Sequence, residues 1–299
     1  MHEFVQHLLI GLSIGATYAL IALGYTMVYG VLRLINFAHG DVYMVGAVTG
    51  YYVAAALVGH VPPWLVLAAV FGSAVVVCCV LGFLIELLAY RPLRNRPRLV
   101  LLITAIGVSL LLENLCQLPM IFGPTPRSYP PELLKALGGA TYFAPVCLGL
   151  SLVLMVAMTW VVMKTKTGLA LRAVSYRFET AQLMGINTNR IISVTFMFGS
   201  GLAAVAGVLD AMRYDVRPLM GVMPGLKAFI AAVLGGIGSI PGALIGGLLI
   251  GVIEAMLRWD AVLPAQYSPY TDAAAFVILI VILLVKPSGL MGRTVQEKV

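Results

Sequence analysis

Polar residues interrupt an apolar stretch near the start of the chain. The segment RLINFAHGD, residues 33–41, places Asn36, His39 and Asp41 between two runs that are each long enough to cross a membrane. Polar backbone at membrane depth is tolerated only where protein or water covers it, and broken helices often line the path of a transporter. The segment is therefore a candidate translocation path. The alternative is a tight cytoplasmic turn in which Asp41 caps the following helix.

Other charged residues also lie inside apolar runs, where each must find a partner or water. Glu113 and Asn114 have no basic residue near them in the sequence, so they are either part of the path or a buried, hydrogen-bonded helix contact. Glu254 and Arg258 are four residues apart in the order that favours a local ion pair. Glu86 is expected to pair with the arginine-rich loop that follows it.

The sequence predicts neither a metal site nor catalysis. His39 and Asp41 are two candidate metal ligands, but no third stands at a suitable spacing. The sequence has no H-E-x-x-H helix, no G-x-S-x-G elbow and no paired aspartates at mid-membrane. It also lacks a G-x-x-x-x-G-K-[ST] loop, so it cannot hydrolyse ATP alone.

Residues 164–190 form a polar segment that is long for a connection in so apolar a chain. Apolar residues recur at steps of three and four, which predicts one amphipathic helix over residues 169–185: Ala170, Val174, Phe178, Ala181 and Met184. Gly185 offers a helix stop. Such a helix is able to lie in the membrane interface, held by its basic residues.

These features must be positioned by membrane-spanning helices. Hydrophobic residues make up 61% of the 299 residues and charged residues only 10%, so lipid must be the solvent for most of the surface. We predict an all-α fold in which residues 1–299 form a single transmembrane domain. About eight spans are expected, near 8–30, 41–59, 64–89, 99–122, 142–163, 191–211, 241–258 and 271–285.

A ninth apolar stretch, residues 225–236, is too short to cross and is predicted to be a half-helix that enters from the outside. It is closed by residues that break helices: Gly235, Gly236, Gly238 and Pro241. Glycine pairs one helical turn apart, such as Gly11 with Gly15 and Gly247 with Gly251, predict close helix packing.

The distribution of Lys and Arg predicts the orientation, because positive loops stay cytoplasmic. The loop RPLRNRPR carries Arg91, Arg94, Arg96 and Arg98 and is placed inside, which puts residues 164–190 and the C-terminal tail inside and the N-terminus outside. Arg33 is also placed inside, and the six remaining basic residues, Lys227 among them, fall in segments assigned to the outer side that also hold Asp210. The net charge of +7 is thus explained without nucleic acid.

The sequence also resembles a known family over essentially its whole length. Glu179-Thr180-Ala181 followed by Gly185 resembles the E-A-A-x-x-x-G loop by which permeases of ATP-binding-cassette importers dock on their ATPases, with Thr180 in place of an alanine. Residues 18–41 and 225–251 look like the N- and C-terminal signatures of the branched-chain amino-acid permease family, a relative of the ribose-type sugar permeases. INFAHGD and GGIGSIPGA are fairly specific to its amino-acid and amide branch.

The resemblance implies a permease subunit of the bacterial inner membrane that translocates leucine, isoleucine or valine. It implies two ATP-binding subunits that hold the ATP, a second homologous permease, and a periplasmic or lipid-anchored amino-acid-binding protein; this chain would bind no cofactor. Closure of the ATPases would push on the coupling segment and tilt the attached spans. The coupling residues implied are Gly168, Arg172, Phe178, Glu179, Ala181 and Gly185.

Two alternatives remain open at this point. The same permease branch looks able to serve urea or short amides, and the sequence cannot name the cargo. A secondary transporter would need a site for a coupling ion, usually formed by acidic residues at mid-membrane, and only Glu113 is a candidate for it.

Overall fold

The computed structural model describes residues 2–94, 96–259, 262, 264, 266, 270–286 and 288–292. They form helices and connecting segments, with an isolated antiparallel bridge between Arg127 and Val216. The helices are α1 (His2–Leu32), α2 (His39–Leu57), α3 (Pro63–Leu84) with a π-helical continuation (Ile85–Tyr90), α4 (Arg98–Gln117), α5 (Pro131–Ala136), α6 (Gly139–Lys164), α7 (Lys166–Tyr176), α8 (Phe178–Leu183), α9 (Thr188–Arg213), α10 (Val222–Gly235), α11 (Ile240–Leu257) and α12 (Thr271–Val285).

Six helices in the described part are long and apolar enough to cross a membrane: α1, α3 with its π-helical continuation, α4, α6, α9 and α11. The all-α prediction is confirmed. The predicted spans 41–59 and 271–285 correspond to α2 and α12, which are helical but are not among these six, and α12 has only 15 residues. The count of eight spans therefore stays a prediction.

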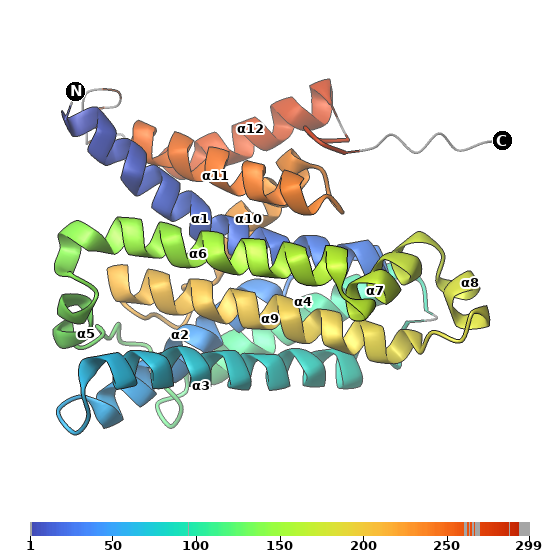
Figure 1. Cartoon of the computed structure of the whole chain (residues 1–299), viewed down its shortest axis with the longest axis horizontal. Helices are drawn as coiled ribbons and strands as arrows, with labels where there is room; N and C mark the ends of the chain where they lie inside the picture. Colours follow the sequence, from blue (N-terminus) through green and yellow to red (C-terminus); the bar gives the residue numbers. More distant parts are fainter. Residues whose placement is uncertain are drawn as a thin grey trace.

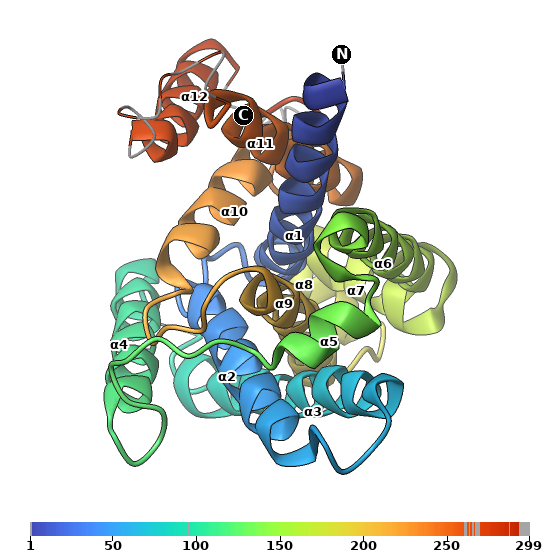
Figure 2. The same cartoon turned by 90° about the vertical axis from the view of Figure 1, so that its left-hand side faces the viewer.

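The long helices α1, α3, α6 and α9 run alongside one another, with α7 and α8 at one end of the bundle and α5 at the other (Figure 1). Helices α1 and α9 are central, because 78% of the most apolar stretch of each is buried. Only 17% of the corresponding stretch of α4 is buried. Figure 2 shows α4 and α12 at the periphery, with α10 between them and α9 near the middle of the bundle. The peripheral helices present their apolar side chains outward, as lipid-facing helices do.

Glycines bring helices α1 and α11 into backbone contact. A Cβ atom added at Gly251 would lie 2.1 Å from the backbone nitrogen of Gly15, and one added at Gly15 would lie 2.7 Å from the Cα of Leu248. The predicted role of these glycines in close packing is confirmed. Where lipid removes the hydrophobic driving force between helices, such close approach gains the van der Waals contact that holds them together.

We expect Gly251→Ala to destabilise the protein, because the new methyl group meets backbone that cannot rotate away. Overpacking of this kind costs about 1–3 kcal/mol, and the midpoint of thermal unfolding in detergent should fall accordingly. Gly149→Ala is the matched control, since a Cβ atom at this helical glycine of α6 has open space around it. Equal midpoints for the two variants would contradict the packing role of the contact between α1 and α11.

Candidate functional site

The polar segment 164–190 folds back on the end of helix α6. The Thr165 hydroxyl accepts a hydrogen bond from the backbone N–H of Gly168 (3.1 Å) and so caps helix α7. A Cβ atom at Gly168 would lie 2.2 Å from the carbonyl oxygen of Val162. Glycine is therefore required at this position for the tight reversal from α6 into α7.

The prediction of one continuous helix over 169–185 is wrong. The backbone of Arg177 is extended (φ −148°, ψ 109°) and separates α7 from α8. The bend turns Phe178 toward the bundle, where the guanidinium of Arg94 lies 6.0 Å from its ring centre. It also rotates the second helix, so Ala181 is buried while Met184, predicted on the apolar face, is 78% exposed.

Helices α7 and α8 expose apolar side chains at the end of the bundle that carries the arginine-rich loop. Those of Leu169, Tyr176, Leu183 and Met184 are largely exposed, next to the exposed polar residues Arg172, Arg177, Glu179 and Thr180. We call these eight residues the docking surface. Clustered apolar residues with polar neighbours mark protein contact sites. Gly185 ends α8 with φ +81° and open space around it, so its requirement for glycine is conformational.

The first break lies deep in the bundle. Helix α1 ends at Leu32, and helix α2 begins at His39, whose ring packs against Gly24 and the edge of the Tyr25 ring. Because Gly24 lies about two turns before the end of α1, α2 starts inside the bundle rather than at its surface. Asn36 is buried in the connecting segment, and its side-chain oxygen accepts a hydrogen bond from the Tyr90 hydroxyl (2.9 Å).

Asp41 lies in the first turn of α2 but not at its N-cap, a position held by Ala38 without a side-chain hydrogen bond. The buried Asp41 carboxylate instead accepts a hydrogen bond from the Ser109 hydroxyl of α4. Glu113 follows Ser109 by one turn on α4 and is partly buried, whereas Asn114 is exposed and its amide donates to the carbonyl of Leu110 (2.7 Å). The predicted path residues therefore do not form one cluster.

The second break has the geometry of a helix pair joined by a tight turn. Helix α10 ends at Gly235, Gly236 and Gly238 adopt φ values of +101° and +95°, and Pro241 lies in the first turn of α11. The Ser239 hydroxyl caps α11 by accepting from the N–H of Gly242 (3.2 Å). Two carbonyl groups at the end of α10 are satisfied by backbone N–H groups near the C-terminus: Leu290 to Leu234 (2.8 Å) and Met291 to Gly235 (3.0 Å).

A buried ion cluster joins α10 to the rest of the bundle. Lys227 of α10 is 3% exposed, and its ammonium lies 2.9 Å from Glu254 of α11 and 2.7 Å from Asp272 of α12. The predicted pair between Glu254 and Arg258 is confirmed at 2.6 Å. The Tyr18 hydroxyl of α1 also donates to Glu254 (2.9 Å). Assigning Lys227 to a nearly neutral outer segment missed this cluster; a lysine inside an apolar run was the signal available.

Two further buried carboxylates have partners on other helices. Asp210 of α9 is buried and accepts a hydrogen bond from the Tyr43 hydroxyl of α2 (2.7 Å), a contact that its assignment to an outer segment did not predict. Glu86 contacts Arg91 and Arg94 at 2.8 Å each, as predicted, and also accepts from a serine hydroxyl of α9. These contacts join the arginine-rich loop to the central helix α9.

Comparisons with known proteins agree along the whole chain. The family model described as the branched-chain amino acid transport system permease component matches residues 7–285. The chain is 44% identical to the high-affinity branched-chain amino acid transport system permease protein LivH of Escherichia coli (strain K12), over 99% of this chain and 98% of that protein. It is 41% identical to the high-affinity branched-chain amino acid transport system permease protein BraD of Pseudomonas aeruginosa, over 100% of this chain and 99% of that protein.

A more distant relative and a solved structure extend the comparison. The probable branched-chain amino acid transport permease protein LivH of Methanocaldococcus jannaschii is 30% identical over 91% of this chain and 88% of its own. A solved chain of PsaBC from Streptococcus pneumoniae, in complex with Fab, has a similar fold, with a TM-score of 0.50 and 13% sequence identity. The match covers 95% of this chain and 92% of that chain. The chain therefore belongs to the family of permease components of branched-chain amino acid transport systems, as a membrane transport subunit and not an enzyme.

Proposed function

We propose that the chain is the permease subunit of an ATP-driven importer that carries leucine, isoleucine and valine across the bacterial inner membrane. It works with two ATP-binding subunits that hold the ATP, a second homologous permease and an external amino-acid-binding protein, and it binds no cofactor itself. The observation that carries the proposal is the docking surface on α7 and α8, which combines exposed apolar side chains with the Glu179–Gly185 motif.

The positions of the basic residues support an orientation with the N-terminus outside and the C-terminal end inside. The arginine-rich loop lies at the same end of the bundle as the docking surface, because Arg94 contacts both Phe178 and Asn189. The N-terminus lies at the opposite end, and α12 runs toward the docking end (Figure 1). In this arrangement α2 and α12 bring the number of membrane spans to eight, and α10 is the half-helix that enters the membrane from the outside.

We place the translocation path along the first break and helix α4. The residues that line it in this proposal are Asn36, His39, Asp41, Glu113 and Asn114. Asp41 supports this role best, because it is a buried carboxylate with a hydroxyl partner and no ion-pair partner in the described part of the chain. A carboxylate of this kind is suited to meet the ammonium group of an amino acid. Neither the amide importer nor the ion-coupled carrier is favoured by the three relatives described above, whose names refer to branched-chain amino acid transport.

Uptake of labelled leucine by the reconstituted complex tests the proposal. Proteoliposomes contain this chain with its candidate ATPases, second permease and binding protein, and ATP is supplied to the compartment that holds the ATPases. We expect ATP-dependent leucine transport that isoleucine and valine inhibit by competition. A complex that assembles and hydrolyses ATP but transports urea or short amides instead of leucine would disprove the cargo.

Gly185→Val should weaken ATPase binding. A β-branched residue at φ +81° costs about 1–2 kcal/mol in backbone strain, so we expect the end of α8 to rearrange and the docking surface to change shape. Co-purification of the ATPase subunits, measured at limiting concentration, should fall. Gly59→Val is the control, because Gly59 has φ +85°, is also surrounded by open space and lies in the loop after α2. Undiminished ATPase binding by Gly185→Val would remove this turn from the docking surface.

Asp41→Asn should lower leucine uptake by about tenfold, the effect of losing one charge-assisted contact with the ammonium group of the cargo. The amide still accepts the hydrogen bond from Ser109, so we expect the complex to assemble normally. Asp215→Asn is the matched control, since Asp215 also accepts a serine hydroxyl bond (2.7 Å, from Ser128) but is exposed. Normal uptake by Asp41→Asn would place the path elsewhere.

A further inference from the structure

The π-helical continuation of α3 lies between the arginine-rich loop and the first break. It covers Ile85–Tyr90, and the backbone N–H of Arg91 donates to the carbonyl of Glu86 (2.8 Å), five residues earlier. An α-helix closes on the fourth residue back, so this turn holds an extra residue. π-helical turns are rare and are frequent at functional sites. The two ends of this one contact different parts of the bundle.

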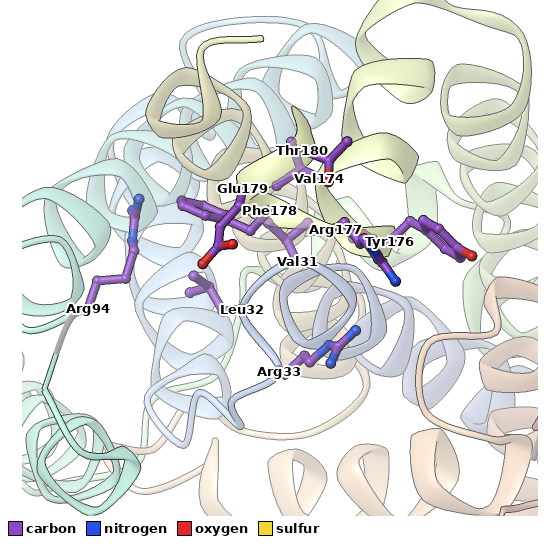
Figure 3. Close-up of a pocket in the computed structure, with 11 residues that line it drawn as sticks. Val31, Leu32, Arg33, Arg94, Val174, Tyr176, Arg177, Phe178, Glu179 and Thr180 are labelled. Atoms are coloured by element: carbon purple, nitrogen blue, oxygen red, sulfur yellow. The ribbon is translucent and has the colours of Figure 1, made fainter. Parts of the chain in front are cut away.

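The first end of the π-helical continuation is connected to the coupling segment, residues 164–190. The Glu86 carboxylate contacts Arg94 (2.8 Å) and accepts a hydrogen bond from the Ser193 hydroxyl of α9 (2.8 Å). The guanidinium of Arg94 also donates to Asn189 (2.7 Å) and faces the ring of Phe178. Phe178 and Arg94 both line a cavity at the end of the bundle that carries the docking surface, and the ring is directed toward the arginine (Figure 3). Helix α8 is thus connected to Glu86 through two side chains.

The other end of the π-helical continuation is connected to the first break. Tyr90 is buried, and its hydroxyl donates to the side-chain oxygen of Asn36 (2.9 Å). Its ring lies against that of Phe196 of α9, with 5.4 Å between the ring centres, so the ring has little freedom to move alone. The backbone carbonyl of Asn36 accepts from the N–H of His39 at the start of α2 (3.1 Å). Tyr90 therefore holds the segment from which α2 begins.

The contact between Tyr90 and Asn36 depends on the π-helical register. Successive residues of an α-helix are rotated by about 100° around its axis. A change from π-helix to α-helix would therefore turn Tyr90 by up to about that angle relative to α3, away from Asn36, while Glu86 at the start of the turn would stay in place. The π-helical continuation thus has two discrete arrangements available, as an element that couples two sites requires.

We propose that the π-helical continuation of α3 transmits movement of the coupling segment to the first break, with Tyr90 as the residue that positions Asn36. The inference rests on the proposed function for the roles of these two segments and adds the route that connects them. Arg94 and Glu86 hold the turn at the docking end, and the Tyr90 hydroxyl carries its rotation to the break. Tyr90 is a positioning residue, because it acts through Asn36 and does not touch the cargo.

Tyr90→Phe tests the route, because it removes the hydroxyl group and keeps the ring that packs on Phe196. Leucine uptake and ATP hydrolysis are measured on the same proteoliposomes of the whole complex. We expect ATP hydrolysis to stay within about twofold of wild type while leucine carried per ATP falls by about fivefold, the effect of losing one buried hydrogen bond. Tyr129→Phe is the matched control, since this buried hydroxyl also donates to α2, at the carbonyl of Ala47 (2.8 Å), but lies outside the route. A ratio of leucine to ATP that Tyr90→Phe leaves unchanged, even if both rates fall together, would overturn the proposal.

A second measurement does not depend on the cargo. Leu34→Cys places a thiol in the partly buried segment beside Asn36, and its rate of labelling by a water-soluble maleimide reports the state of the first break. The rate is measured on the whole complex with and without trapping by ATP and vanadate, and the complex without Leu34→Cys gives the background. We expect trapping to change the rate, and Tyr90→Phe but not Tyr129→Phe to abolish this change.

The outcomes of the labelling experiment separate this inference from the proposed function. An equal change of labelling with and without Tyr90→Phe, or no change in either, overturns the route. A complex in which the break responds to trapping through Tyr90, but which carries no leucine with ATP, overturns the proposed cargo and leaves the route supported.

Discussion

The structure depends on one constraint: every polar group inside an apolar bundle must find its partner within the protein. Helix α2 begins inside the bundle and α10 ends inside it, so both breaks leave backbone and charged groups away from the ends of the long helices. Helices α1 and α9 cover the first break, where His39 lies against Gly24 and Gly199, and α1 packs against α10 and α11 on either side of the second break. The ion cluster of Lys227, Glu254, Asp272 and Arg258 satisfies the charges beside the half-helix with two positive and two negative groups.

The same constraint explains the small residues at the centre. A broken helix can be covered only if its neighbours approach closely, and a Cβ atom at Gly221 would lie 2.1 Å from the carbonyl oxygen of Gly40, at the start of α2. Glycine thus allows the start of α10 to meet the start of α2. A tightly packed centre resists gradual bending, so the alternating access implied by the proposed function would move discrete packed elements.

In the proposed complex, the coupling segment of residues 164–190 connects this centre to the ATPases. Its bend at Arg177 makes it two short helices instead of one rigid lever. In the proposed mechanism, a push on α8 passes through Phe178 and Arg94 to the arginine-rich loop and Glu86, and through Thr165 to α6.

The sequence by itself determined the features that depend on composition and local spacing: the helical class, six of the spans, the pairs Glu254–Arg258 and Glu86 with its arginines, and the family. Hydropathy and short-range charge order are local properties, so they can be read without knowing which helices meet. Only the tertiary structure decided the partners of Lys227 and Asp210, the contact of Asp41 with Ser109, and the bend at Arg177. Each of these depends on side chains that approach from helices distant in the sequence, which no local pattern records.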